Sequence, residues 1–378
     1  MKRLRVEKHE HLGTPSDPSP AAIDAARVWE AAESAMLGHA DFSYGAGEIA
    51  AYAAEDADEA MVLFLVRDGD RCVGFLHADL PLRDNVHLTH VELRAMPDVD
   101  AVEVLDAAWP EFAAFCREKR RTAITFWELS GMDGATIRAA NGDGAVAPTP
   151  VTEWLAARGF FLDQVEVAST ATVDSAPIAA LDGEPDTASG AGIADGYRVR
   201  TWDGPTPPDL VDGLVRLRAR MYVDAPHGSR TQEEGNWDAD RVRRVDAQIA
   251  EAGRTALWAV ALDESDEPVA YTCLECPGFR PDVAFQQDTF VRRDDRGHGL
   301  GMAVKAANLR QLRRVRPQVA RVHTWNAGEN EWMLAINREL GYVPTCVVGA
   351  WELGTAGMGA TEVGTAETAT AETGAAGE

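Results

Sequence analysis

The stretch "DDRGHGLGMAVKAANL", Asp294 to Leu309, decides how the second half of this chain is interpreted. It places Gly297, Gly299 and Gly301 within five positions, and a helical pattern of apolar residues follows directly. Glycine in a folded segment costs conformational entropy and contributes no side chain to packing. A glycine cluster at the start of a helix therefore indicates a backbone that turns sharply or approaches another group closely.

The glycines lie where a predicted strand becomes a predicted helix. The strand is "FQQDTFV", Phe285 to Val291, and the helix begins near Leu300. The first backbone N–H groups of a helix have no intrahelical acceptor, and the helix dipole is positive at that end. The junction is therefore predicted to bind an anion such as pyrophosphate, with Arg296 adding a fixed positive charge.

The residues around the glycines exclude two other glycine-rich loops. A P-loop ends in Gly-Lys-Ser or Gly-Lys-Thr, whereas Met302 follows Gly301 here. A dinucleotide-binding loop has the spacing Gly-x-Gly-x-x-Gly after the first strand of its domain, and the glycines at 297, 299 and 301 do not match it. A tight strand-to-helix turn that binds no ligand stays open as an alternative.

The remaining pattern is Arg-x-x-Gly-x-Gly, formed by Arg296, Gly299 and Gly301. It resembles the acyl-CoA-binding loop of the GNAT superfamily of N-acyltransferases. A second string, "TWNAGENEWMLAINRELGYVP", is similar to another signature of that superfamily. The residues that match this signature in register are Asn326, Asn330, Met333, Asn337, Leu340, Gly341 and Tyr342. The resemblance is specific over residues 255–353 and weaker over 210–253.

The resemblance implies a fold and a cofactor site. The fold is α/β with a mixed sheet, in which two central parallel strands diverge and the pantetheine arm of acetyl-CoA, the expected co-substrate, inserts between them. The backbone of Phe290 and Val291 is then expected to pair with that arm. The expected pyrophosphate ligands are Arg296 and the backbone amides of Gly297, His298, Gly299, Leu300 and Gly301, with Asn326 and Asn330 on the opposite wall. A core or N-cap role is the alternative for the two asparagines.

The chain also repeats itself faintly at a separation of roughly 200 residues. The run "MVLFLVRDGDRCVGFLHADL" predicts a hairpin in the first half, and "TALWAVALDESDEPVAYTCLEC" predicts one in the second. Each hairpin is followed by a strand, a helix, a strand, a helix and a final strand. Two tandem GNAT-like domains are therefore predicted at 1–172 and 198–353, with a linker at 173–197 and a disordered acidic tail at 354–378. We refer to the two domains as the first copy and the second copy.

The first copy departs from the superfamily pattern. Its corresponding stretch, "VELRAMPDVDAVEVLDAAW", contains no glycine, and Asp98 and Asp100 would meet a phosphate with negative charge. We therefore expect the second copy to bind acyl-CoA and the first copy not to bind it. Tandem members of the superfamily similar to mycothiol synthase also pair a degenerate copy with an active one.

Direct acyl transfer to an amine requires a base near the amine and a proton for the departing thiolate. Asp288, on the strand that leads to the glycines, is the first candidate for the base, and Glu275 and His323 are further options. A solvated strand aspartate is the alternative for Asp288. The resemblance aligns the usual tyrosine acid with Asn337, which cannot release a proton, so Tyr342 is the candidate substitute.

Composition and charge limit the partners of the protein. The formal net charge of −25 disfavours nucleic-acid binding, because that affinity comes mostly from Lys and Arg. No apolar run is long enough to span a membrane, so we expect a cytoplasmic protein without membrane association, either a monomer or a homodimer. The five cysteines are an odd number without a zinc-site pattern, so we expect reduced thiols and no metal.

The acceptor is expected to be a primary amine of a small molecule, and the negative charge favours cationic amines. The acceptor cleft is predicted between the helical region Leu214–Arg230 and the last helix of the second copy, with Asp224, Glu233 and Glu234 near its rim. A protein lysine or N-terminus as acceptor, and a noncatalytic acyl-CoA-binding scaffold, are the alternatives.

Overall fold

The structure is a computed structural model that describes residues 4–54, 56–181, 196–224 and 235–353. The predicted tail and most of the predicted linker lie outside these residues. Its elements up to the predicted linker are β1 (Arg5–His9), β2 (Gly13–Thr14), β3 (Asp17–Pro18), α1 (Pro20–Leu37), α2 (Ala46–Tyr52), β4 (Glu59–Asp68), β5 (Arg71–Pro81), β6 (Leu88–Ala95), α3 (Ala101–Glu118), β7 (Ala123–Ser130), β8 (Ile137–Arg138), β9 (Ala145–Val146), α4 (Pro150–Ala157) and β10 (Phe161–Thr172).

The remaining elements follow the same order in the second copy. They are α5 (Ala176–Ala180), β11 (Arg198–Asp203), the 3-10 turn η2 (Pro208–Leu210), α6 (Val211–Asp224), α7 (Ala239–Glu251), β12 (Arg254–Leu262), β13 (Pro268–Pro277), β14 (Val283–Val291), the 3-10 turn η3 (Arg293–Asp295), α8 (Leu300–Val315), β15 (Arg321–Ala327), α9 (Glu331–Glu339) and β16 (Val343–Leu353). The short helix α5 lies inside the segment that the sequence predicts as linker.

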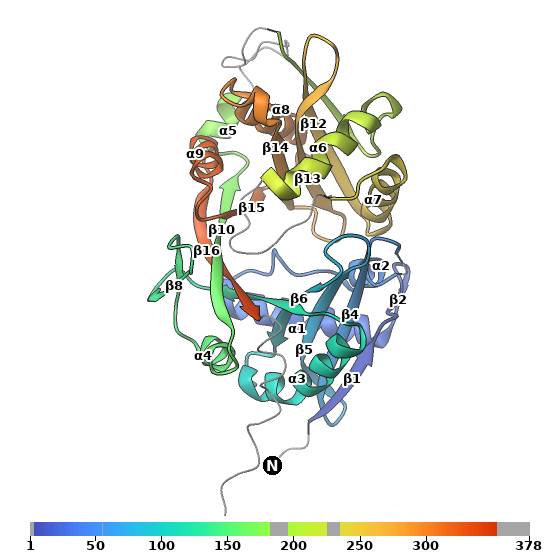
Figure 1. Cartoon of the computed structure of the whole chain (residues 1–378), viewed down its shortest axis with the longest axis vertical. Helices are drawn as coiled ribbons and strands as arrows, with labels where there is room; N and C mark the ends of the chain where they lie inside the picture. The colour runs from blue at the N-terminus through green and yellow to red at the C-terminus, as the bar shows by residue number, and fades with distance from the viewer. Residues whose placement is uncertain (1–3, 55, 182–195, 225–234, 354–378) are drawn as a thin grey trace, which may run out of the picture.

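One mixed sheet connects the two copies. Its twelve strands run in the order β1-β4-β5-β6-β7-β16-β10-β15-β14-β13-β12-β11. The predicted hairpins are β4–β5 and β12–β13, and each copy contains one parallel pair, β6–β7 and β14–β15. The mixed α/β fold that the sequence predicts is therefore confirmed (Figure 1).

The final strand of each copy pairs with the other copy. β10 lies between β15 and β16, both of which belong to the second copy, and β16 lies between β10 and β7 of the first copy. In Figure 1 the two strands run side by side along one flank of the molecule, from the second copy above toward the first copy below. The two copies consequently share one hydrogen-bonded sheet.

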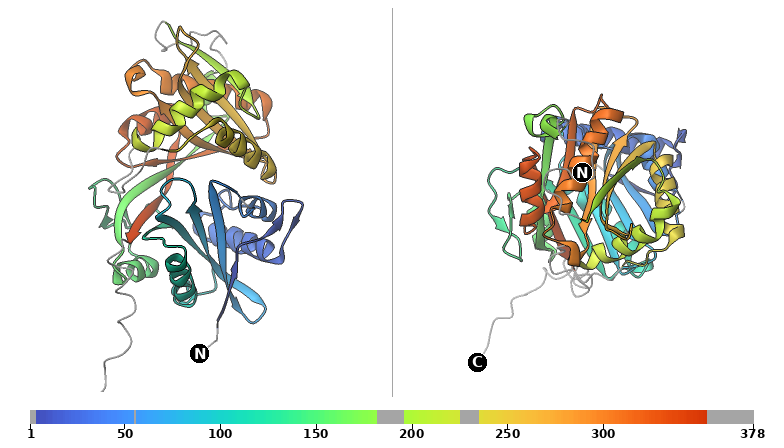
Figure 2. Two further views of the ribbon diagram at one scale, coloured as in Figure 1. Left: turned by 45° about the vertical axis from the view of Figure 1, so that its right-hand side comes forward. Right: turned by 90° about the horizontal axis from the view of Figure 1, so that it is seen from above.

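Helices cover both faces of each half of the sheet, and the exchanged strands contribute to the opposite cores (Figure 2). In the second copy, α6 and α7 pack on one face and α8 on the other. Trp351 and Leu353 of β16 are buried among residues of α3, α4 and β7 in the core of the first copy. Ala171 of β10 is buried in the core beneath α8. All five cysteines are buried and free, as predicted.

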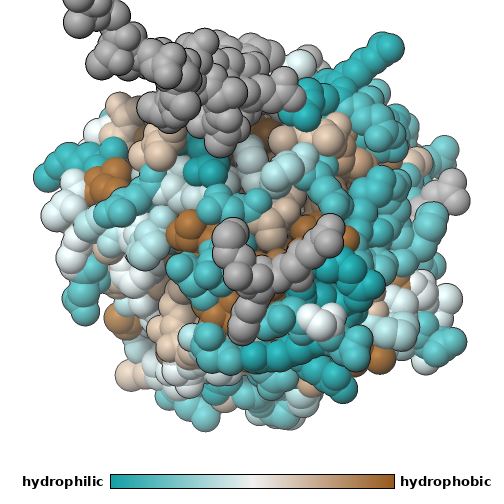
Figure 3. Space-filling model, turned by 90° about the horizontal axis from the view of Figure 1, so that it is seen from below, coloured by the Kyte–Doolittle hydropathy of each residue, from teal (hydrophilic) through white to brown (hydrophobic). Residues whose placement is uncertain are grey.

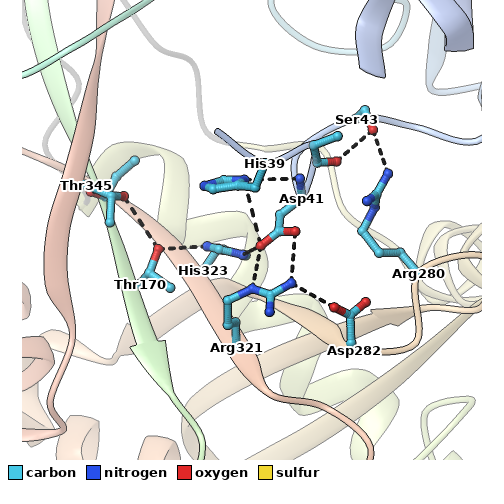
Figure 4. A network of polar contacts seen from close by, with 11 residues as sticks. His39, Asp41, Ser43, Thr170, Arg280, Asp282, Arg321, His323 and Thr345 are labelled. Atoms are coloured by element: carbon cyan, nitrogen blue, oxygen red, sulfur yellow. Dashed lines mark hydrogen bonds and ion pairs between the residues drawn. The ribbon is translucent and has the colours of Figure 1, made fainter. Parts of the chain in front are cut away.

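A buried polar network fixes the connection between α1 and α2 to β15 (Figure 4). Both carboxylate oxygens of Asp41 accept hydrogen bonds from Arg321, at 2.7 and 3.0 Å. His323 contacts Asp41 through Nε2 at 2.9 Å and Thr170 of β10 through Nδ1 at 2.8 Å. The hydrogen bonds to His323 and Arg321 hold the pKa of Asp41 well below its usual range, although burial opposes them. One side chain of the first copy is thereby bound to a strand of the second.

One face of the molecular surface is shown in Figure 3. Seen from below in Figure 3, it is mostly hydrophilic, and its hydrophobic residues occur in scattered groups. Among the described residues, no helix is long and apolar enough to cross a bilayer.

Candidate functional site

The glycine loop has the geometry of an anion-binding helix start. Gly297 and Gly299 have φ angles of 85° and 74°, in the left-handed region that favours glycine, and Gly299 is the N-cap of α8. No side chain caps this end of α8. The amides of Leu300 and Gly301 therefore lie in the first turn, where a helix offers its N–H groups no intrahelical acceptor. The loop and the dipole of a 16-residue helix together favour an anion here.

The strands before the loop diverge as expected. β14 and β15 pair in parallel from Val283 to Gln286, and β14 then continues to Val291 without this partner. The N–H of Arg292 donates to Val269 O of β13. Successive residues of a strand direct their N–H and C=O groups to opposite sides, so those of Val291 face away from β13, toward the side where β15 no longer pairs. Arg296 extends to the same place, because its Nε donates to Val291 O at 3.2 Å. An extended ligand chain can pair with β14 in this gap.

A β-bulge interrupts β14 next to the gap. The register between β13 and β14 shifts between the pairs Thr272–Thr289 and Leu274–Gln286, which leaves one extra residue on β14. The side-chain amide of buried Gln286 fills the interruption by donating to Cys273 O at 2.7 Å. The bulge brings Asp288 to the wall of a cavity. In the first copy, β5 and β6 pair without such an interruption.

Asp288 lies in a cavity of about 320 Å³ between the two copies. Solvent reaches its side chain through the cavity, yet protein atoms surround it, and this desolvation raises the pKa of the carboxyl above its usual value. Arg218 of α6 and a hydrogen bond from Tyr271 Oη to Oδ2, at 3.4 Å, oppose that rise. A carboxylate with a raised pKa beside a cavity is a suitable base for an amine.

The cavity has one wall from each copy. Residues of α6, α7 and β12 to β14 form the second-copy wall. The first-copy wall contains Asp56, Asp58, Glu59, Pro81, Asp84, Asn85, Leu88 and His90. The sequence predicts the last helix of the second copy as the other wall, but α9 contributes no residue to this cavity. Asp224 is paired with Arg220 and Arg293, and Glu233 and Glu234 lie outside the described residues.

The asparagines of the second signature lie on β15 and on α9 or its N-cap. Asn330 is the N-cap of α9, accepting from the N–H of Met333 at 3.3 Å. Asn337 is buried and donates to Asn326 Oδ1 at 2.6 Å. α9 packs against the glycine loop, since a Cβ built on Gly301 would lie 3.2 Å from Ile336 Cδ1. This geometry gives Asn330 a capping role and gives Asn337 the role of holding Asn326.

The other candidate catalytic side chains lie apart from Asp288. Tyr342 is buried in the core below α8, where its Oη has no hydrogen-bond partner among the described residues and burial raises its pKa. His323 uses both ring nitrogens in the network of Figure 4. Glu275 does line the cavity, but Arg254 binds its carboxylate at 3.0 Å. Nothing in this arrangement supports Tyr342 as a proton donor to a thiolate, and its role stays a prediction.

The first copy keeps the cleft but not the anion site. β6 and β7 also diverge, after Glu92 and Trp127, and a cavity of about 410 Å³ with mostly apolar walls lies beside them. The start of α3 is capped by Asp100, whose carboxylate accepts from Val102 N at 2.9 Å. A carboxylate of the chain itself therefore occupies the place where a phosphate would bind.

Sequence reasoning missed the cavity residues that come from outside the second signature. Arg218 and Trp237 precede the region of specific resemblance, and Asp58 and Asp84 belong to the other copy. The acidic and aromatic residues of these segments do not follow a motif spacing that would identify them as site residues. Only the docking of the copies brings them to Asp288.

Comparison with known proteins supports the tandem arrangement. No protein-family model and no curated protein sequence matches the chain. Among solved structures, it is similar to a tandem GNAT protein from the clavulanic acid biosynthesis pathway, solved without AcCoA, with a TM-score of 0.72 and 22% identity over 93% of this chain and 99% of that chain. It is also similar to a GCN5-related N-acetyltransferase from Sphaerobacter thermophilus, with a TM-score of 0.58 and 14% identity over 93% and 96% of the two chains. Special likeness to mycothiol synthase stays a prediction.

Proposed function

We propose that this chain, which has the tandem GNAT fold, transfers an acyl group from acyl-CoA to the primary amine of a small molecule. Acetyl-CoA is the proposed donor. One observation carries the proposal: β14 serves two sites at once. Its C-terminal end leads into the open glycine loop, and its bulge places Asp288 on the cavity between the copies.

The residues of the chain suit direct transfer. The amine nitrogen forms a bond to the thioester carbonyl carbon, the carbon–sulfur bond breaks, and the electron pair leaves with the sulfur. The proton that the amine loses passes to Asp288, and the thiolate takes one proton to leave as free thiol. Tyr271 holds the Asp288 carboxylate through its hydroxyl and is thus a positioning residue.

The walls of the cavity favour a small acceptor over a protein. Residues of both copies enclose a space of about 320 Å³. Ion pairs such as Arg244–Asp58, at 2.7 Å, and Arg241–Asp84, at 2.7 Å, join α7 to the first copy beside this space. A small molecule can occupy a space of this size whole, whereas a folded protein could insert only a side chain.

Release of free thiol from acetyl-CoA, in the presence of a panel of small amines and of a lysine-containing peptide, tests the proposal. The expected result is turnover with a small amine and loss of at least about 100-fold in kcat for Asp288→Asn, because general base catalysis contributes about 10²–10⁴-fold. Binding of acetyl-CoA without turnover of any amine would leave the scaffold alternative. Turnover confined to the peptide would favour the protein-acetylating alternative.

A further inference from the structure

Arg218 of α6 is a buried cation in the cavity that contains Asp288. Its side chain is 7% exposed, and its guanidinium lies 4.6 Å from the centre of the Trp237 ring and 4.9 Å from that of Trp258. Among the described residues, none forms a hydrogen bond or ion pair with Arg218, and its Nε is a buried donor without an acceptor. The aromatic rings thus fix the plane of a guanidinium whose donors are unused.

Three other arginines between the copies, Arg241, Arg244 and Arg254, have acidic partners. Arg241 pairs with Asp84 at 2.7 Å, Arg244 pairs with Asp58 through two nitrogens, and Arg254 pairs with Glu48 at 2.7 Å. Burying a cation is costly unless an anion or several hydrogen bonds compensate it. Stacking on tryptophan supplies part of that compensation. Among the described residues, Arg218 therefore differs from these three arginines in having no carboxylate at ion-pair distance.

Further donors of the cavity are also unused. The indole N–H groups of Trp237 and Trp258 are buried without an acceptor among the described residues. A guanidinium edge matches a carboxylate, with two parallel N–H···O bonds, and both oxygens have lone pairs left for other donors. The chemistry missing from this side of the cavity is an anionic oxygen pair.

The charges around Arg218 favour a monoanion over a phosphate. Asp56, Asp58, Glu59 and Asp84 line the first-copy wall, and Asp288 lies on the second-copy wall. Arg218 and Asp288 attract each other through space, since the guanidinium acts to lower the pKa of that carboxyl. A doubly charged phosphate would be repelled by these carboxylates, whereas a molecule with one negative and one positive end meets an opposite charge at both.

We propose that the acceptor is a small amino carboxylate, an amino acid or a molecule of similar size, whose carboxylate binds Arg218 between Trp237 and Trp258 and whose amine faces Asp288. This inference rests on the proposed function and narrows it. It also narrows the expectation of cationic amines, because a polycation would leave Arg218 without a carboxylate and would be repelled by it.

The test compares each acceptor with its neutral counterpart, using the full chain. Amino acids, the matching amino acid amides, aminophosphonates and a polyamine are each assayed for thiol release from acetyl-CoA, and their binding is measured separately by calorimetry. The expected result is that the best amino acid exceeds its amide by at least 100-fold in kcat/KM and that Arg218→Met removes this preference. Arg220→Met is the matched control, since that residue is on the same helix, half exposed, and paired with Asp224.

The outcomes separate the two proposals. If amides or polyamines react as well as amino acids, or if an aminophosphonate is preferred, the role of Arg218 is overturned while acyl transfer stands. If amino acids bind in an Arg218-dependent way but no amine is acylated, the proposed function fails and the carboxylate site stands. If no amino acid binds or reacts, the inference is wrong. The comparison of ligands on the unaltered protein decides the matter even if Arg218→Met does not fold.

Discussion

Asp288 lines a cavity open to solvent and Lys305 is buried, and desolvation shifts the pKa values of the two groups in opposite directions. For the carboxyl of Asp288, burial disfavours the charged form and raises the pKa. For Lys305, in the second turn of α8, the side chain is 1% exposed and burial lowers the pKa to about 7. The Nζ atom of Lys305 lies 5.4 Å from the centre of the Tyr342 ring, as in a cation–π contact. The raised pKa of Asp288 bears on the proposed reaction rate, and the lowered pKa of Lys305 bears on the stability of the fold.

If Asp288 is the base, activity should depend on its deprotonated form. We expect kcat/KM to fall as the pH drops through the raised pKa of Asp288, at a higher pH than for an ordinary aspartate. Asp288→Asn should lower kcat and flatten this limb while leaving the affinity for acetyl-CoA nearly unchanged. Asp266→Asn, in the exposed turn between β12 and β13, is the control. An unaltered pH profile in Asp288→Asn would remove Asp288 from the mechanism.

Lys305→Met should stabilise the protein at pH 7. The folded state binds fewer protons at Lys305 than the unfolded state does between pH 7 and the ordinary lysine pKa, so stability contributed at this site rises with pH over that window. Removing a buried amine whose charged form is desolvated should recover about 1–3 kcal/mol. Urea unfolding at pH 7 and pH 9 measures both effects, and Lys119→Met, at an exposed position after α3, is the control. A gain that is equal at both pH values would contradict the assigned titration.

At the scale of elements, the starts of α8 and α3 differ in what they offer an anion. α8 begins at a left-handed glycine without a side-chain cap, whereas the carboxylate of Asp100 caps α3. A cavity also lies beside the diverging strands β6 and β7, so the two copies differ at the helix start rather than in the divergence of the strands. Acyl-CoA binding should therefore depend on the α8 end only.

Calorimetry with acetyl-CoA should give one bound equivalent per chain. Gly301→Val should weaken that binding at least 10-fold, about 1.4 kcal/mol, because a side chain there meets Ile336 and obstructs the approach to the first amides of α8. Gly131→Val is the matched control, since a Cβ at Gly131 has open space around it and no positive φ is required. A second equivalent that survives Gly301→Val would show that the first copy binds acyl-CoA.

The sequence predicted the local elements well. It did not predict that β10 and β16 pair with strands of the opposite copy. The hairpins around Gly69 and Asp266, the glycine loop and the helix after it follow from turn chemistry and apolar period, which are local properties. β10 and β16 have similar patterns and would fit either sheet position, so no local signal assigns them to the opposite copy. For the same reason Asp288 could be proposed from its strand, whereas Arg218 needed the assembled cavity.

At the scale of the molecule, the exchanged strands make the two copies one structural unit. β16 contributes Trp351, which is 2% exposed, to the core of the first copy. β10 contributes Ala171 to the core of the second. Since each sheet is completed by the other half of the chain, neither half should unfold alone.

Trp351→Ala should destabilise the whole protein by about 3–5 kcal/mol, as expected for loss of a large buried side chain. Differential scanning calorimetry should show a single transition that moves to lower temperature without splitting. Trp332→Ala is the control, because Trp332 lies on α9 of the same copy and is 86% exposed. Cooperative unfolding would be contradicted if Trp351→Ala showed two transitions, one at lower temperature and one at the temperature of the unaltered protein.

The position of β16 also bears on how the protein is made. A ribosome delivers β7 long before it delivers the strand that pairs with β7, because β16 ends at Leu353. At ~5–20 residues per second, the edge of β7 stays unpaired for roughly ten seconds or more during synthesis. Unpaired strand edges are sites of aggregation. The emerging first copy is therefore expected to be most prone to aggregation in the interval before translation of the second copy is almost finished.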